Sequence, residues 1–143
     1  MIPDQMIAGR AAEHLVIADI LLAGYPAFLV DAGLPYDLAA DVGGRIVRVQ
    51  VKATDSPCSA PSQVFRRDGR YMFNLRRRRG AACTLAESAD VFAFVGLDVR
   101  RVAYLSADEL DQGEGKVAQC VAIRTEGRGR TFDSLASFLE AAA

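Results

Sequence analysis

The chain has 143 residues, of which 51% are hydrophobic and 24% are charged, and its formal net charge is -1. One domain holds roughly 100–200 residues and this composition argues against disorder, so we expect a single globular domain over residues 1–143. No segment stays apolar over the roughly 20 residues of a membrane-spanning helix, and no basic region leads into an apolar run at the N-terminus. We therefore expect a cytoplasmic protein without a membrane partner.

The cysteines and the distribution of charge further restrict the kinds of site and partner that the protein can have. Cys58, Cys83 and Cys120 are odd in number and scattered, which argues against a disulfide framework or a zinc site. Residues 45–79 contain ten basic residues and two acids, a sum of +8, whereas the flanking segments sum to -5 and -4. An acidic body with one basic region suits a polyanionic partner.

The first elements have clear sequence signals. Residues 4–23 are rich in Ala, Leu and Ile and begin at a potential N-cap, Asp4, so they predict a helix. Residues 27–31 are a short apolar run bounded by turn residues and predict a strand. Residues 36–41 and 45–54 flank Gly43-Gly44, which is typical of a tight hairpin turn between two strands.

The remaining elements complete a mixed α/β pattern. Residues 55–69 are polar and predict a loop, and a strand over residues 70–75 follows. Apolar runs predict buried strands at residues 90–97 and 102–106, a short helix at 107–110 and a last strand within 117–125. The spacing of apolar residues from Phe132 to Leu139 predicts an amphipathic helix over residues 132–143.

The hairpin predicts a cluster of polar side chains. In the strand 45–54 the valines fall on one face and the polar residues on the other. A two-residue glycine loop sets a register that places Asp37 opposite Gln50. Directly opposed side chains have Cβ atoms about 5 Å apart. Asp37 and Gln50 should therefore share a polar face with Lys52, two residues along.

The first helix offers a further carboxylate. At about 100° per residue, Glu13 projects among Met6, Ile17 and Ile20, away from a side that we assign as polar and that includes Ala12. Glu13 should therefore point toward the polar side of the hairpin. Because burying an unpaired carboxylate is costly, this residue should meet a metal, a cation or a hydrogen-bond donor.

These residues resemble the pattern of the PD-(D/E)xK nuclease superfamily, a helical Glu, then an Asp on one strand and (D/E)xK on the next. The corresponding residues are Glu13, Asp37 and Gln50-Val51-Lys52. The QxK variant is most similar to the branch that contains intron-encoded homing endonucleases and small relatives. The resemblance implies a restriction-endonuclease-like core, in which a central mixed β-sheet is flanked by an N-terminal helix and a C-terminal helix.

The resemblance further implies hydrolysis of DNA phosphodiester bonds with Mg²⁺ or Mn²⁺. Glu13, Asp37 and the backbone carbonyl of Val51 would bind the metal, which lowers the pKa of a bound water. Lys52 would orient that water or stabilise the developing negative charge. Gln50 completes the implied catalytic set, although its amide carries no charge and cannot act as a general base.

Arginines of the basic segment suit contacts with phosphates, since neutralising phosphates releases counterions and raises affinity at low salt. The candidates are Arg48, Arg66, Arg67, Arg70, Arg76, Arg77, Arg78 and Arg79. A solvated basic loop, or ion pairs with a neighbouring subunit, is an equal alternative for them. Cutting both DNA strands generally needs two active sites, so we expect a homodimer or a larger two-fold assembly.

Each candidate also has a structural interpretation. Asp37 and Gln50 could form a surface cross-strand pair, and Glu13 could be the ion-pair partner of Arg10. We expect Asp41 to stabilise the adjacent turn, and His14 to be structural. Tyr71 and Phe73 are expected in the core rather than stacked on bases, and Asp90 should be a boundary or capping residue.

Two other functions stay open. The first is a nucleic-acid-binding module that keeps the nuclease fold without catalysis, which the uncharged Gln50 favours. The second is a structural or oligomerising subunit whose arginines contact other subunits. Binding of duplex DNA separates this second alternative from the others, and metal-dependent nicking of plasmid separates the enzyme from the binding module.

Overall fold

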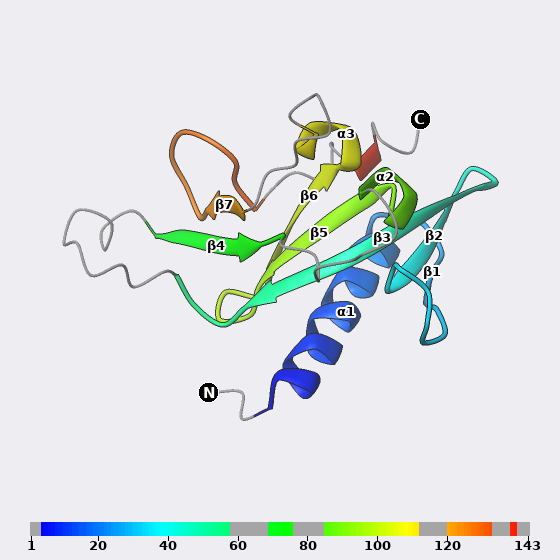
Figure 1. Cartoon of the computed structure of the whole chain (residues 1–143), viewed down its shortest axis with the longest axis horizontal. Coiled ribbons are helices and arrows are strands. Elements are labelled where there is room, and N and C mark those ends of the chain that lie inside the picture. The colour runs from blue at the N-terminus through cyan, green and yellow to red at the C-terminus, as the bar shows by residue number, and fades with distance from the viewer. Residues whose placement is uncertain (1–3, 58–68, 76–84, 112–119, 133–137, 140–143) are drawn as a thin grey trace.

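The computed structural model describes residues 4–57, 69–75, 85–111, 120–132 and 138–139 (Figure 1). Its elements in chain order are α1 (Gln5–Leu22), β1 (Ala27–Leu29), β2 (Leu38–Val42), β3 (Arg45–Thr54), β4 (Arg70–Asn74), α2 (Leu85–Ser88), β5 (Val91–Gly96), β6 (Arg101–Ser106), α3 (Ala107–Leu110) and β7 (Cys120–Arg124). In this part of the chain we find no helix with the length and apolar character needed to cross a membrane.

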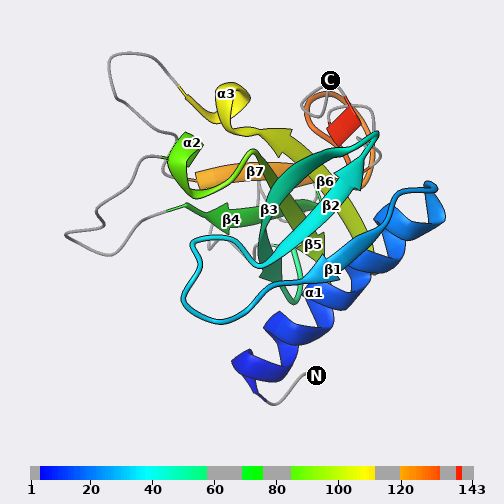
Figure 2. The same ribbon diagram turned by 90° about the vertical axis from the view of Figure 1, so that its right-hand side faces the viewer.

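Five strands form a central mixed sheet in the order β1-β2-β3-β5-β6. β3 and β5 run parallel, whereas the other neighbours are antiparallel. α1 covers one face of this sheet, and the two-stranded sheet of β4 and β7 covers the other (Figure 2). The expected fold class, a mixed α/β domain with a central sheet and an N-terminal helix, is confirmed.

The start of α1 follows from its sequence. Asp4 is the N-cap, and its carboxylate accepts a 2.8 Å hydrogen bond from the N–H of Met6, one of the donors that a helix start leaves without an intrahelical partner. The helix stops at Leu22, just before Gly24, whose φ of 96° suits glycine. The predicted helix is therefore confirmed.

The buried face of α1 differs from the expected one. Ala12, Val16 and Ile20 form the buried stripe, whereas Met6 is 82% exposed. Assigning Ala12 to the polar side was wrong. Because α1 is apolar nearly all round, its hydrophobic pattern does not select one face. A small alanine also lets the helix backbone lie close to the sheet.

The glycine hairpin forms as predicted. β2 pairs with β3 so that Val42 lies opposite Arg45 and Leu38 lies opposite Val49. The turn residues Gly43 and Gly44 have φ values of 63° and 86°, as a primed hairpin turn requires. The carboxylate of Asp41 accepts a 2.8 Å hydrogen bond from the N–H of Gly44, which confirms its turn-stabilising role.

The central sheet separates two hydrophobic cores. The helix-side core contains the buried residues of α1 and the valines of β3, and the second core is rich in aromatic residues from β4, β5 and the segment after β7. Gln50 lies beside Phe92 and Lys52 beside Phe94 in the parallel pairing, and both phenylalanines belong to the second core. Gln50 and Lys52 therefore face away from α1. The expectation that the helix packs on the polar side of the hairpin was wrong, because it packs on the valine side.

Other predicted elements have mixed outcomes. The strands near residues 70–75, 90–97, 102–106 and 117–125 and the short helix at 107–110 are confirmed, whereas α2 was not predicted. The polar loop falls mainly on residues 58–68, outside the described residues. Of the predicted C-terminal helix, Phe138 and Leu139 are helical, and residues 133–137 and 140–143 lie outside the described part. Phe138 is buried against Tyr104, with ring centroids 5.4 Å apart.

Candidate active site

Asp37 lies one residue before β2, where the chain leaves the regular ladder. Its N–H donates to the carbonyl of Val49 at 2.9 Å. Its carboxylate atom Oδ2 accepts a 2.7 Å hydrogen bond from the backbone N–H of Val51. Since β2 begins at Leu38, opposite Val49, the carboxylate of the preceding residue lies at the edge of β3 that β2 leaves uncovered. The predicted register thus brings Asp37 to the Gln50–Lys52 segment, but at the strand edge rather than on the face of Gln50.

Glu13 approaches Asp37 from the helix side. Both residues line one depression of about 450 Å³ between α1 and the segment that joins β1 to β2. The side chain of Glu13 is 20% exposed, because its position follows Ala12 and lies beside the buried stripe. The structure therefore brings the helical acid and the hairpin aspartate together.

The pKa of Asp37 is raised above the ordinary value of an aspartate. Burial is the main cause, and the negative charge of Glu13 adds to it. The hydrogen bond from Val51 and the positive charge of Lys52 act in the opposite direction. Asp37 thus lies within electrostatic reach of both predicted charged partners.

Lys52 acts on Asp37 from the other face of the sheet, the face on which Gln50 also lies. Both side chains are partly buried on the face that carries the second core. β3 continues beyond Val49, which lies opposite the first residue of β2. This part of its edge is therefore open to groups from both faces of the sheet. Three of the predicted catalytic residues therefore lie around a strand edge, with Glu13 on one side, Lys52 on the other and Asp37 at the edge, and Gln50 shares the face of Lys52.

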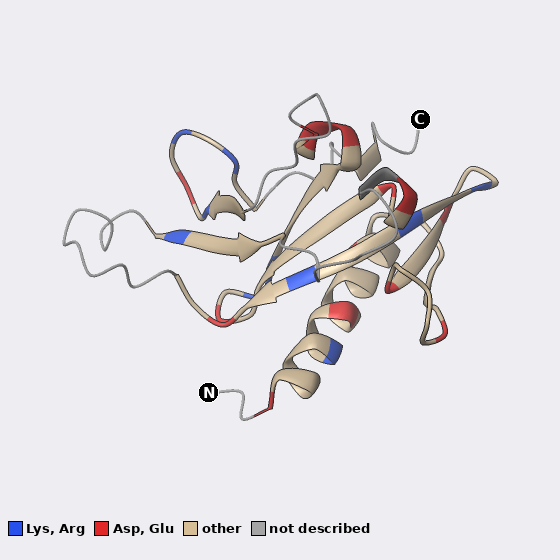
Figure 3. Cartoon of the chain, in the orientation of Figure 1, with Lys and Arg blue, Asp and Glu red and all other residues tan. Residues whose placement is uncertain are grey.

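The carboxylate of Glu13 also has a cationic partner. Oε2 of Glu13 lies 2.9 Å from Nη1 of Arg10, one helical turn earlier on α1. Figure 3 shows the basic and the acidic position adjoining on this helix. The structural interpretation of Glu13 as the partner of Arg10 is therefore confirmed, within the same depression that Asp37 lines.

The donor set fits a hard divalent cation. Two carboxylates lie close enough for Glu13 to raise the pKa of Asp37, a repulsion that a cation between them would offset. The N–H and C=O of one strand residue point to the same edge, so the carbonyl of Val51 faces the edge where Asp37 lies. Among the described residues, no three His, Cys, Asp or Glu side chains gather as a metal site. A third protein ligand from these residues would therefore be a neutral oxygen, such as the backbone carbonyl of Val51.

The predicted phosphate contacts divide into two groups. Arg48 binds Asp90, with Nη2 2.9 Å from Oδ1, and its Nη1 donates to the carbonyl of Glu87 at 2.8 Å. These bonds connect β3 to the start of β5 and to α2, which favours a structural role for Arg48. Arg70 lies at the start of β4 and is partly buried. Arg66, Arg67, Arg76, Arg77, Arg78 and Arg79 lie outside the described residues.

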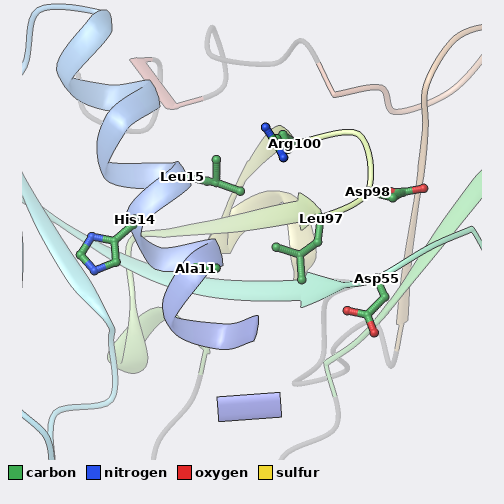
Figure 4. A pocket seen from close by; sticks show the side chains of 7 residues that line it. All are labelled: Ala11, His14, Leu15, Asp55, Leu97, Asp98 and Arg100. Carbon is green, nitrogen blue, oxygen red and sulfur yellow. The ribbon is translucent and has the colours of Figure 1, made fainter. Parts of the chain in front are cut away.

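A separate depression of about 700 Å³ opens between α1 and the turn after β5 (Figure 4). Ala11, Leu15 and Leu97 form its apolar part, and charged or polar side chains stand around them. The sticks of His14, Asp55, Asp98 and Arg100 point in different directions rather than toward one centre. None of the four predicted catalytic residues lines this depression, so His14 lies apart from the Glu13–Asp37 site.

The second wall of the candidate site was not predicted from the sequence. Residues of the segment between β1 and β2, from Val30 to Leu34 together with Tyr36, line the depression opposite α1. Their position immediately before Asp37 was the available signal. Asp90 was predicted only as a boundary or capping residue, since its pairing with Arg48 spans 42 positions in sequence.

No protein-family model and no curated protein matches this sequence. The structure is similar to that of a bacterial homing endonuclease, with a TM-score of 0.67 and 21% sequence identity. The similarity covers 97% of this chain and 91% of the other. At this level of identity it shows a shared fold. The chain therefore has the nuclease-like mixed α/β fold of that endonuclease.

Proposed function

We propose that this chain is an Mg²⁺-dependent endonuclease that hydrolyses phosphodiester bonds of DNA. The observation that carries the proposal is the environment of Asp37. Its carboxylate accepts a hydrogen bond from the N–H of Val51, and the charges of Glu13 and Lys52 shift its pKa in opposite directions. The PD-(D/E)xK resemblance implies Glu13, Asp37 and Lys52 as members of the catalytic set. The homing endonuclease with the same fold supports DNA as the substrate.

Each residue has a defined role in this proposal. Glu13, Asp37 and the carbonyl of Val51 would hold Mg²⁺ or Mn²⁺, which when bound lowers the pKa of a water molecule and neutralises phosphate charge. Lys52 donates a hydrogen bond to the attacking water or to the phosphate oxygen that gains negative charge. Gln50 orients the same water through its amide.

The proposal extends to the assembly and to the DNA contacts. Residues 45–79 carry a sum of +8, which supports contacts between this segment and the phosphate backbone. Cleavage of both strands would require a second site, which a two-fold homodimer supplies.

Nicking of supercoiled plasmid in Mg²⁺ or Mn²⁺ tests the proposal. We expect wild-type protein to nick the plasmid, and Asp37→Asn and Lys52→Ala to lose at least about 100-fold in rate, since even outer partners of a metal site contribute 10- to 100-fold. Asp41→Asn is the matched control, because Asp41 lies in the same hairpin but binds the turn. Equal rates for all four proteins would contradict the proposal.

A second candidate function is a DNA-binding module without catalysis. The ion pair between Arg10 and Glu13 favours it, since a carboxylate that a guanidinium already neutralises attracts a cation less strongly. Gln50, which carries no charge, acts in the same direction. Wild-type protein that binds duplex DNA but nicks plasmid with neither metal would support this module over the enzyme.

A further inference from the structure

Arg10 stands at the candidate site without a role in the proposed chemistry. We propose that Arg10 is a DNA-phosphate contact of this site, which Glu13 holds in position and releases when its own carboxylate is engaged by the divalent cation. The inference rests on the proposed function and assigns a substrate-binding residue that the nuclease pattern does not contain.

The geometry places Arg10 at the mouth of the depression. Its side chain is 62% exposed, whereas that of Glu13, 2.9 Å away, is 20% exposed. The two residues line the same depression as Asp37. A DNA strand that approaches Asp37 would therefore meet the guanidinium of Arg10 before the carboxylate of Glu13.

The charges of the depression favour a cationic contact. Among the described residues that line it, the acids are Glu13, Asp31 and Asp37, and Arg10 is the one basic residue. Three carboxylates repel a phosphate diester unless positive charge intervenes. Arg10 lies at the place where such charge is needed.

The chemistry of the guanidinium suits an exchange of its partner from Glu13 to a DNA phosphate. Arginine presents five donors in a planar fork that matches two phosphate oxygens, and its bond to Glu13 uses Nη1. An exposed ion pair within one helical turn is weak, so it can be replaced by a phosphate without a large energetic cost. Arg10 therefore binds Glu13 in the free protein and DNA in the complex.

The pairing also predicts competition at Glu13. In the free protein Arg10 and the divalent cation bind the same carboxylate, so Arg10→Gln should tighten Mn²⁺ binding about two- to fivefold, the strength of an exposed pair. Mn²⁺ binding without DNA can be measured by electron paramagnetic resonance. Arg128→Gln, which removes an exposed arginine that does not line the depression, is the charge-matched control and should leave the affinity nearly unchanged.

A double-mutant cycle in EDTA tests the contact with DNA. Glu13→Gln should strengthen binding to duplex DNA, because it frees Arg10 and removes a repelling charge. In the Arg10→Gln background Glu13→Gln should increase DNA affinity less, since it then only removes a repelling charge. Arg10→Gln should also lower the slope of log K against log salt by about 0.9 in Glu13→Gln protein, the value for one phosphate contact. Arg10→Lys, which keeps the charge, should retain the slope.

The outcomes separate the two proposals. Equal gains from Glu13→Gln with and without Arg10, or an unchanged Mn²⁺ affinity in Arg10→Gln, would overturn the role of Arg10. The proposed function would stand in that case if Asp37→Asn still abolished Mn²⁺ binding and nicking. Wild-type protein that neither binds Mn²⁺ nor nicks DNA would overturn the proposed function, and this inference with it.

Discussion

The N–H of Val51 donates a 2.7 Å hydrogen bond to the carboxylate of Asp37, which holds the aspartate at the open edge of β3. This bond keeps the side chain next to Glu13 although burial and the charge of Glu13 both oppose its ionisation. The effect of the charge on Asp37 can be tested without substrate, because an asparagine at this position can accept the same hydrogen bond without the charge.

Asp37→Asn should raise the melting temperature at pH 7. The pKa of Asp37 is raised in the folded protein, chiefly by burial, so the folded state binds the proton more tightly than the unfolded state does. The stability that this group contributes is fully present below about pH 4, the ordinary range of aspartate, and is lost as the pH rises through the raised pKa. The advantage of the variant should therefore shrink toward pH 4.

Thermal unfolding of both proteins at several pH values, without divalent cations, measures this difference. Asp41→Asn serves as the control, since Asp41 belongs to the same hairpin and its amide can still accept from Gly44. A variant less stable than wild type at pH 7 would show that Asp37 is stabilised by its surroundings rather than strained by them.

Tyr71→Phe should destabilise the second core. The hydroxyl of Tyr71 donates to the carboxylate of Asp98, 2.9 Å from each oxygen. The residue is 1% exposed, and its ring packs edge-on against Phe132. Phenylalanine keeps the packing and loses the bond, at a cost of about 1–2 kcal/mol in the free energy of unfolding. Chemical denaturation at pH 7 measures the cost.

Tyr71→Phe should also change how the stability of the protein depends on pH in alkaline solution. Burial, followed by the hydrogen bond and the charge of Asp98, raises the pKa of Tyr71 to about 12. A raised pKa means that the stability contributed by the protonated hydroxyl is present below about pH 10 and is lost as the pH rises toward 12. Wild-type protein should lose more stability than Tyr71→Phe over this interval, and parallel curves would contradict the assignment.

Gly96→Ala should destabilise the protein by roughly 1–3 kcal/mol, the usual cost of overpacking. A Cβ atom at Gly96 would lie 3.0 Å from atoms of Phe132 and Val99 and 3.1 Å from Tyr71. Gly9 is the matched control, because it lies inside α1 with nothing within 4 Å of an added Cβ. Gly9→Ala should stabilise by about 0.5–1 kcal/mol. Urea denaturation of the two variants should therefore show shifts of opposite sign.

Arg48→Gln should affect stability rather than DNA binding. The substitution removes the bonds from Arg48 to Asp90 and to the carbonyl of Glu87, at a cost of roughly 1–2 kcal/mol for this partly exposed pair. Burial acts to raise the pKa of Asp90, but the side chain, N–H and charge of Arg48 together lower it. Stability from a lowered carboxyl pKa is present above about pH 4 and is lost as the pH falls.

The penalty of Arg48→Gln should accordingly be largest near neutral pH and shrink below pH 4, which thermal unfolding would show. The salt dependence of DNA binding should match that of Arg128→Gln, which removes an equal charge from an exposed position. A distinctly smaller salt slope for Arg48→Gln would restore the earlier interpretation of Arg48 as a phosphate contact.

Local features of the molecule could be predicted because neighbouring residues make them. Asp4 begins α1, and the Gly43-Gly44 turn sets the pairing of β2 with β3 within a few positions along the chain. The same register brought Asp37 to the segment that ends in Lys52. The strands β5 and β6 were predicted from apolar runs for the same reason.

The faces of these elements could not be predicted in this way. α1 is apolar nearly all round, so the residue that became its contact with the sheet, Ala12, was assigned to the opposite side. The even-numbered side chains of β3 were expected on a polar face that receives Glu13, but aromatic residues of other strands cover much of that face. The position of Lys52 relative to Glu13 depended on which face of β3 packs against α1.

The sequence by itself determined the helix start, the hairpin and the approach of Asp37 to the strand of Lys52, because hydrogen bonds between residues close in the sequence decide them. Only the tertiary structure decided that Glu13 and Lys52 reach Asp37 from opposite faces of the sheet, and that Arg48 binds Asp90 across 42 positions. Such contacts form when α1, the central sheet and the second sheet pack together, and their energies depend on burial that no single segment contains.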